Sequence, residues 1–223
     1  MDKFALFDTN KTIVADKKDI SPYISESIRN IYGLITTVDI TKYEDFTAKE
    51  TAIEILKENG ISEQEINARL DRYLEDLPYS YYNVAWSDKI NILDGAKQLL
   101  EFLTKKGVMI GIATGEPAKI AKMRLEKVGL EKYFTFNSSA ENGQTPSLIL
   151  DSALKTLSLD YGFEKTDGLF FSSSKRFIEA AHQLGLYSVG VATNTNDINA
   201  LINAGSNEII SSLKEKPHFL KNI

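Results

Sequence analysis

The sequence contains no cysteine, only two histidines and a single tryptophan among its 223 residues. Without cysteine the chain cannot form disulfides, thiolate nucleophiles or zinc–thiolate sites. Neither His182 nor His218 has a set of further candidate ligands beside it, so a histidine metal site is not expected. No apolar run approaches the roughly 18 residues that span a bilayer, and no signal-peptide pattern precedes the first apolar run. We therefore expect a cytoplasmic protein.

The chain also has fewer basic than acidic residues. The chain has 26 Lys and Arg against 31 Asp and Glu, a formal net charge of −5. An acidic chain repels phosphate backbones, which argues against nucleic acid and anionic membranes as partners. Hydrophobic residues make up 43% and charged residues 26%, a balance typical of globular domains. The length suits one core domain with a modest insertion, or two small domains.

Short apolar runs alternate with amphipathic stretches over most of the chain. The apolar runs predict strands at 4–7, 108–113, 134–136, 168–171, 188–191 and 208–210. The amphipathic stretches predict helices at 95–106, 117–128, 146–157, 175–184 and 197–203. This alternation predicts an α/β fold with a Rossmann-like parallel sheet that helices cover on both faces. Because ligands bind beyond the carboxyl ends of such strands, the residues directly after each strand are the candidates for function.

The segment from Asp16 to about Glu75 has a helical pattern and no convincing strand. Ser21-Pro22 favours a helix start, and a helical period from Thr47 to Glu58 is followed by Asn59-Gly60. A capping-box pattern at 62–65 begins a further apolar stripe. We predict a small α-helical cap at 15–87, inserted after the first strand of a core formed by 1–14 and 88–223.

The segments that follow the predicted strands carry a family resemblance. They include Asp8-Thr9-Asn10, Thr114-Gly115, Gln144, Ser172-Ser173-Ser174 and Phe177. The stretch 7–13 resembles the first motif of the haloacid dehalogenase superfamily, D-x-D-G-T-L, and 110–115 resembles its second, a strand ending in Thr or Ser. The stretch 143–146 resembles the third motif, G-K-P-x-P, and 171–181 the fourth, V-G-D-S-x-x-D-I-x-A-A. The resemblance is closest to the phosphoglycolate phosphatase and β-phosphoglucomutase-like branch, which has a helical cap.

The resemblance implies phosphoryl-transfer chemistry. Asp8 stands at the position of the nucleophile that forms an aspartyl-phosphate. The family's second Asp, two positions on, protonates the leaving group and then activates water. A Thr, here Thr114, and loop N–H groups hold the phosphate oxygens, while a Lys neutralises charge. Carboxylates of the fourth motif hold Mg²⁺, which prefers oxygen ligands.

The sequence departs from that pattern at most of these positions. The acid–base position is Asn10, which cannot exchange a proton at neutral pH. The Gly after it is Lys11, and the Lys position is Gln144. Ser173 and Phe177 stand at the metal-carboxylate positions, so no Mg²⁺ cofactor is expected. We predict a relative of small-molecule phosphomonoester phosphatases that is catalytically weak or inactive.

A ligand-binding role remains open. With one Asp left and Lys11, Lys175 and Arg176 close to strand ends, the pocket is predicted to have reversed its sign. We expect Thr114, Gly115, Lys11 and Gln144 to hold a phosphate or sulfate ion or a phosphorylated metabolite, without metal. Two alternatives remain: an active phosphatase with an atypical site, and a non-enzymatic role with a protein partner.

Structural interpretations of the same residues also remain open. Asp8 can pair with Lys11 or Lys175, and Thr114 can cap the helix that starts near Pro117. The aromatic residues Tyr79, Tyr81, Tyr82 and Trp86 can pack a hinge or line a cleft under the cap.

Overall fold

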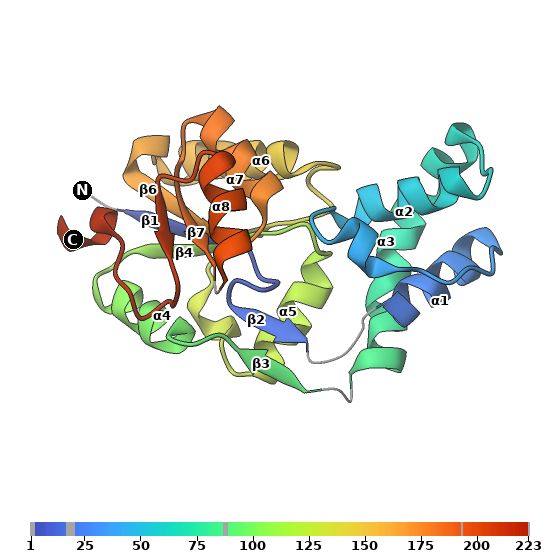
Figure 1. The fold of residues 1–223 in the computed structure, drawn as a ribbon, viewed down its shortest axis with the longest axis horizontal. Coiled ribbons are helices and arrows are strands. Elements are labelled where there is room, and N and C mark those ends of the chain that lie inside the picture. Colours follow the sequence, from blue (N-terminus) through green and yellow to red (C-terminus); the bar gives the residue numbers. More distant parts are fainter. Residues whose placement is uncertain (1–2, 17–20, 87–88, 193, 223) are drawn as a thin grey trace.

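A computed structural model describes residues 3–16, 21–86, 89–192 and 194–222 (Figure 1). Its centre is a six-stranded parallel sheet in the order β5-β4-β1-β6-β7-β8. The strands are β1 (Phe4–Phe7), β4 (Met109–Ala113), β5 (Phe136–Ser138), β6 (Gly168–Ser172), β7 (Tyr187–Val191) and β8 (Glu208–Ile210). The predicted parallel sheet is thereby confirmed.

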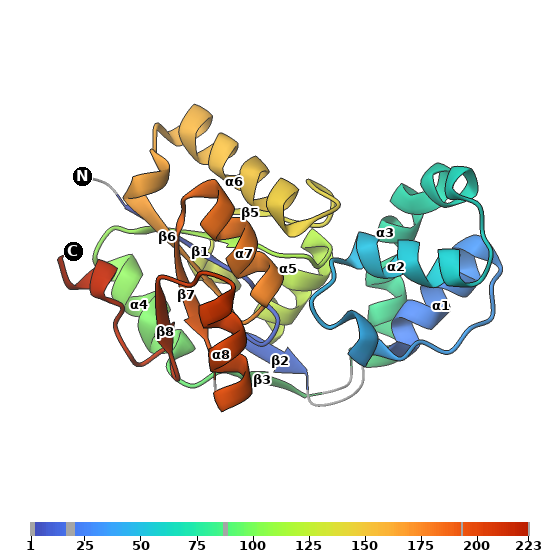
Figure 2. The same cartoon turned by 45° about the horizontal axis from the view of Figure 1, so that its top comes forward.

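The central strand, β1, is buried on both faces, as its unbroken apolar run requires. Ala5 and Phe7 pack on one face with residues of α4 (Ala96–Lys105) and α5 (Ala118–Lys127). Phe4 and Leu6 pack on the other face with α6 (Pro146–Tyr161) and α7 (Lys175–Leu184). Helix α8 (Thr195–Asn203) follows β7 (Figure 2). The two helical layers close the α/β core.

Three helices form a separate lobe with its own apolar core, the predicted helical cap (Figures 1 and 2). They are α1 (Ser21–Tyr32), α2 (Ala48–Glu58) and α3 (Glu63–Ala85). A full capping box at Thr47 and Glu50 starts α2, and the Ser62 side chain caps α3. Among the described residues no helix is both long and apolar enough to cross a bilayer.

A two-stranded antiparallel ribbon joins the cap to the core. It consists of β2 (Val14–Asp16) and β3 (Ile90–Ile92), which were not among the predicted strands. Both strands have only three residues, and they lie outside the alternation of apolar runs and amphipathic stretches that predicts the sheet. The predicted boundary at 15 falls inside β2, and residue 87 lies outside the described residues, as do 17–20 and 88, so the division into domains stays a prediction.

Some element boundaries differ from the prediction. The strand predicted at 134–136 is Phe136–Ser138, because the chain first leaves a 3₁₀ turn at Glu131–Tyr133. Helix α6 continues past 157 to Tyr161, where Gly162 ends it in a left-handed conformation. The stretch between α1 and α2 is not continuous helix; its one helical piece is a 3₁₀ turn at Ile40–Tyr43.

Candidate functional site

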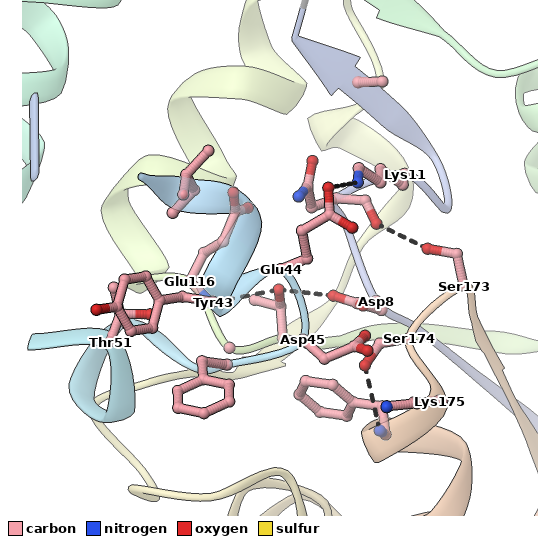
Figure 3. Close-up of a pocket in the computed structure, with 18 of the residues that line it drawn as sticks. Asp8, Lys11, Tyr43, Glu44, Asp45, Thr51, Glu116, Ser173, Ser174 and Lys175 are labelled. Carbon is pink, nitrogen blue, oxygen red and sulfur yellow. Dashed lines mark hydrogen bonds and ion pairs between the residues drawn. The ribbon is translucent and has the colours of Figure 1, made fainter. Parts of the chain in front are cut away.

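A cavity of about 590 Å³ lies between the carboxyl edge of the sheet and the cap (Figure 3). Its core side includes Asp8, Thr114 and Glu116, which follow neighbouring strands β1 and β4. Its cap side includes Tyr23, Ile24, Tyr43, Phe46, Tyr73 and Leu77. The cavity is thus polar at the sheet edge and mostly apolar under the cap.

Asp8 is the most enclosed acidic group of this edge, with 6% of its surface exposed. Its Oδ1 accepts hydrogen bonds from the Thr114 hydroxyl at 2.9 Å and the Thr9 N–H at 2.8 Å, and its Oδ2 accepts one from the Ser172 hydroxyl at 3.1 Å. Burial is the main cause that raises the pKa of Asp8 to about 7; Thr114 lowers it, and the negative charge of Glu116 raises it further. Asp8, Thr114 and Ser172, which stand at the ends of neighbouring strands, therefore meet at the carboxyl edge of the parallel sheet.

Among the contacts described for Asp8 there is none with Lys11 or Lys175, the partners expected for it. Lys11 Nζ lies 3.2 Å from Glu44 of the cap, and both side chains are more than half exposed. Lys175 is exposed at the start of α7, while every hydrogen bond described for the Asp8 carboxylate comes from a hydroxyl or a backbone N–H. Asp8 is too deeply buried for these surface lysines, and short hydroxyl side chains take their place.

Asn10 is held by a buried arginine that was not among the predicted site residues. Arg124 of α5 is fully buried, and its Nη2 donates to Asn10 Oδ1 at 3.2 Å. Its Nη1 forms an ion pair with Glu116 Oε1. Arg124 lies in the buried stripe of α5 with Ile120, Ala121 and Leu125, and a charged residue in an apolar stripe is the signal that was available.

Glu116 connects to Asp8 through two threonine hydroxyls. Thr9 Oγ1 donates to Glu116 Oε2 at 2.6 Å and lies 2.9 Å from Thr114 Oγ1, which in turn contacts Asp8. The Glu116 side chain is 15% exposed and lines the cavity. Two carboxyl groups therefore border the same site, one on each side of the threonine pair.

The cavity has not reversed its charge as predicted. Its lining includes five acidic residues, Asp8, Glu44, Asp45, Glu116 and Asp197, against the two lysines Lys11 and Lys175. Three N–H groups of the loop after β1 are also engaged within the protein: Thr9 N–H donates to Asp8, Lys11 N–H to Val14 and Thr12 N–H to Thr9. The prediction rested on the residues near the strand ends alone. The cap loop at 44–45 adds two carboxylates to the cavity, and this depends on how the cap is placed.

Two of the predicted phosphate-binding positions contact the cap. The Gly115 carbonyl accepts from Ala48 N–H at 2.8 Å, and a Cβ at Gly115 would lie 3.0 Å from Thr47 Cα. The Gln144 carbonyl accepts from the Thr47 hydroxyl at 2.6 Å, while the exposed Gln144 residue lies outside the cavity lining. Thr114 does not cap α5, whose N-cap residue is Pro117 without a side-chain cap.

The described residues do not fit a family-like Mg²⁺ site. Ser173 Oγ donates to the Asn10 carbonyl at 3.3 Å, and Phe177 is buried against Phe170. Nowhere in the described parts of the chain do three or more His, Cys, Asp or Glu residues gather as metal ligands. Mg²⁺ gives up its water reluctantly and needs anionic oxygens, which Ser173 and Phe177 do not supply.

Arg176 is also engaged within the protein. Its guanidinium donates to both carboxylate oxygens of Glu50 on α2, at 2.7 and 2.6 Å, and lies 4.8 Å from the centre of the Phe46 ring. The hydrogen bonds to Glu50 are the main cause that raises the pKa of Arg176. A fork-to-fork pair of this kind is the strong form of ion pair. Arg176 thus fastens the cap to α7.

The aromatic cluster at the end of α3 lies outside the cavity lining. Tyr82 and Trp86 stack on one another, and Lys127 of α5 lies 4.7 Å from the Trp86 ring. Lys119, also on α5, lies 4.3 Å from the ring of Tyr79. The contacts of Tyr79 and Trp86 favour the hinge interpretation, because they join the cap to the core, whereas Tyr81 packs against Tyr23 within the cap.

Comparison with known proteins identifies the family. The sequence model of the haloacid dehalogenase-like hydrolase family matches residues 5–191 of this chain. The chain belongs to this family. A phosphorylated carbohydrates phosphatase of Thermotoga maritima is 29% identical over 210 residues, covering 88% of this chain and 93% of the relative. A phosphoglycolate phosphatase of Synechococcus elongatus is 27% identical over 115 residues, 52% of each chain.

Solved structures of other proteins share the fold of this chain. CbbY from Rhodobacter sphaeroides, in complex with phosphate, has a TM-score of 0.74 at 16% identity, covering 96% of each chain. A β-phosphoglucomutase from Clostridium difficile has a TM-score of 0.67 at 18% identity, covering 98% of this chain and 94% of that one. At these identities the likeness concerns the fold alone.

Proposed function

We propose that this haloacid dehalogenase-like protein binds a small phosphorylated metabolite, or phosphate itself, without the family's Mg²⁺-dependent turnover, and that it does so in the cytoplasm. The observation that carries the proposal is the hydrogen bond that holds the side chain of Asn10. Its amide oxygen accepts from the buried Arg124, at the position where the family has its acid–base Asp. An amide held in this way cannot protonate a leaving group or activate water.

The surroundings of Asp8 support the loss of turnover. Hydroxyl and N–H donors occupy both oxygens of Asp8, and a pKa of about 7 leaves much of the group protonated near neutrality. A protonated carboxyl is a poor nucleophile. Removing one electrostatic stabiliser typically costs about 10²–10³ in rate. Several such losses are not additive, yet they act in the same direction.

The cavity supports ligand binding. It is of the size that takes a small molecule, and the relatives and CbbY connect this fold with phosphorylated compounds. The phosphate group would contact Thr114 and Lys11 at the sheet edge, while the apolar cap side takes the rest of the ligand. The surplus of carboxylates in the lining implies weak, salt-sensitive binding at neutral pH.

The proposal is tested by two measurements on the same protein. A panel of small phosphomonoesters, assayed with and without Mg²⁺, should give background turnover that Asp8→Asn does not change. Calorimetric titration with phosphate at neutral pH should show weak binding that Asp8→Asn strengthens and Lys11→Ala weakens. Mg²⁺-dependent turnover that disappears in Asp8→Asn would overturn the proposal.

A second candidate is an active phosphatase with an atypical site. It is favoured by Glu116, a second carboxyl group at the cavity edge, which borders the site of the lost acid–base residue. In that case Glu116→Gln would abolish turnover that the wild-type protein shows without Mg²⁺. The non-enzymatic interaction role stays a prediction.

A further inference from the structure

Asp8 and Glu116 are joined by an unbroken chain of short oxygen–oxygen contacts. Asp8 Oδ1 lies 2.9 Å from Thr114 Oγ1, Thr114 Oγ1 lies 2.9 Å from Thr9 Oγ1, and Thr9 Oγ1 lies 2.6 Å from Glu116 Oε2. Thr9 and Thr114 are almost completely buried, with 0% and 1% of their surface exposed. Each link of the chain needs one hydrogen atom, because two oxygens at this distance without a hydrogen repel each other.

The two hydroxyls supply only two of the three hydrogens. If both carboxyl groups were ionised, Thr114 would donate to Asp8 and Thr9 to Glu116, and no hydrogen would remain between the two threonines. One proton on a carboxyl group completes the chain, since all hydroxyls then donate in the same direction. The proton belongs at the Asp8 end, because Arg124 pairs with Glu116 and stabilises its negative charge.

We propose that Asp8 and Glu116 share one proton along Thr114 and Thr9, and that an anionic ligand binds in the cavity together with this proton. The proposal rests on the proposed function, and it makes Glu116 a functional residue of the site. The retained proton keeps Asp8 neutral and so removes the charge that would repel the anion. Loss of the proton places two carboxylates within one hydrogen-bonded chain and weakens binding.

The charged neighbours of the pair come from five parts of the structure. Lys11 lies in the loop after β1, Arg124 lies on α5, and Lys175 and Asp197 lie at the starts of α7 and α8. Glu44 and Asp45 face the same cavity from the cap. Lys11 pairs with Glu44, and Arg124 pairs with Glu116. The group expected to titrate near neutrality is the shared proton, in agreement with the raised pKa of Asp8.

Sulfate is the appropriate probe, because its charge does not change around neutral pH. Its affinity should be measured by calorimetry about one pH unit below and above the Asp8 pKa of about 7. Only the protonated site binds well, so the fraction of competent protein, and with it the affinity, should fall about tenfold over this range. Asp8→Asn should bind sulfate equally well at both pH values.

Thr9→Val and Ser172→Ala separate a shared proton from burial alone. Thr9→Val keeps the shape but interrupts the chain, so the Asp8 pKa, followed by ¹³C NMR of its carboxyl group, should fall and the pH dependence of sulfate binding should disappear. Ser172→Ala removes a hydroxyl that donates to Asp8 outside the chain, so the same pKa should rise. Glu116→Gln should lower it, because Arg124 then lacks its negative partner.

The outcomes are distinct. An Asp8 pKa that is unchanged in Thr9→Val would overturn the shared proton. Sulfate affinity that does not vary with pH in the wild-type protein would overturn the coupling to ligand binding. Absence of sulfate binding at either pH, in Asp8→Asn as well, would instead overturn the proposed function, and the NMR titration would still decide whether the proton is shared.

Discussion

The surroundings of Asp8 and the cap contact use different chemistry. At the sheet edge the side chains around Asp8 are hydroxyls, those of Thr114, Ser172 and the neighbouring Thr9. At the cap contact charged residues meet directly, as Arg176 with Glu50 and Lys11 with Glu44. A haloacid dehalogenase-like phosphatase needs its charges where phosphate and metal sit. In this protein two of the cations beside the strand ends, Lys11 and Arg176, pair with carboxylates of the cap, which a count of charges in the sequence cannot show.

The ion pairs of the molecule also differ in burial. Arg124 and Glu116 are 0% and 15% exposed, Arg176 and Glu50 are 29% and 11% exposed, and Lys11 and Glu44 are 57% and 56% exposed. Loss of one partner is costly in a buried pair and almost free in an exposed one. A substitution that removes one partner should therefore lower the free energy of unfolding most where the pair is most buried.

The largest effect is expected for Arg124→Met. The substitution removes the positive charge and leaves Glu116 buried without its partner, which should lower the free energy of unfolding by about 3–5 kcal/mol. Urea denaturation measures this change. The double variant Arg124→Met/Glu116→Gln serves as the control and should recover part of the loss, because no uncompensated charge remains. Equal stability of the single and double variants would contradict the buried pair.

Asp8→Asn should change how stability depends on pH. The pKa of Asp8 rises from 3.8 in the unfolded chain to about 7 in the folded protein, so the folded state binds the proton more tightly. Stability is then full below about pH 4 and falls as pH rises towards 7, by up to about 4 kcal/mol in total. Asp8→Asn lacks this loss and should be more stable than the wild-type protein above neutral pH. The same denaturation curves, repeated across this range, would show a parallel pH dependence of both proteins if Asp8 were not responsible.

The sequence predicts the sheet edge better than the cap contact, for a physical reason. Asp8, Thr114 and Ser172 follow apolar runs, and parallel strands bring their carboxyl ends to one edge wherever the helices lie. The partners of Lys11 and Arg176 depend on how the cap is placed, which no local pattern encodes. Glu116 and Arg124 were predictable in part, because an arginine in the apolar stripe of α5 demands a buried acidic partner.

Arg176→Gln tests the cap contact. The variant loses the two charge-assisted hydrogen bonds to Glu50 but leaves the capping box of α2 in place, so unfolding should become easier by about 1–3 kcal/mol. Hydrogen exchange of the Ala48 amide, which donates to Gly115, should accelerate as the cap detaches. Lys155→Gln, which removes an exposed pair with Asp151 on α6, is the matched control and should change neither quantity measurably. An equally small effect of Arg176→Gln would show that the cap is held by its apolar contacts alone.

The smallest effect concerns the backbone of Lys11. This residue has a φ of 54°, in the left-handed region, where a side chain other than glycine costs about 1–2 kcal/mol. Lys11→Ala and Lys11→Gly both lose the exposed pair with Glu44, so that contribution cancels between them. Glycine relieves the left-handed strain but adds freedom to the unfolded chain, which offsets about 0.4–1 kcal/mol. Lys11→Gly should therefore be more stable than Lys11→Ala by about 1 kcal/mol in urea denaturation. If the alanine variant is as stable as the glycine variant, the loop after β1 relaxes out of the left-handed conformation, and Lys11 is held there by its contact with the cap rather than by the turn.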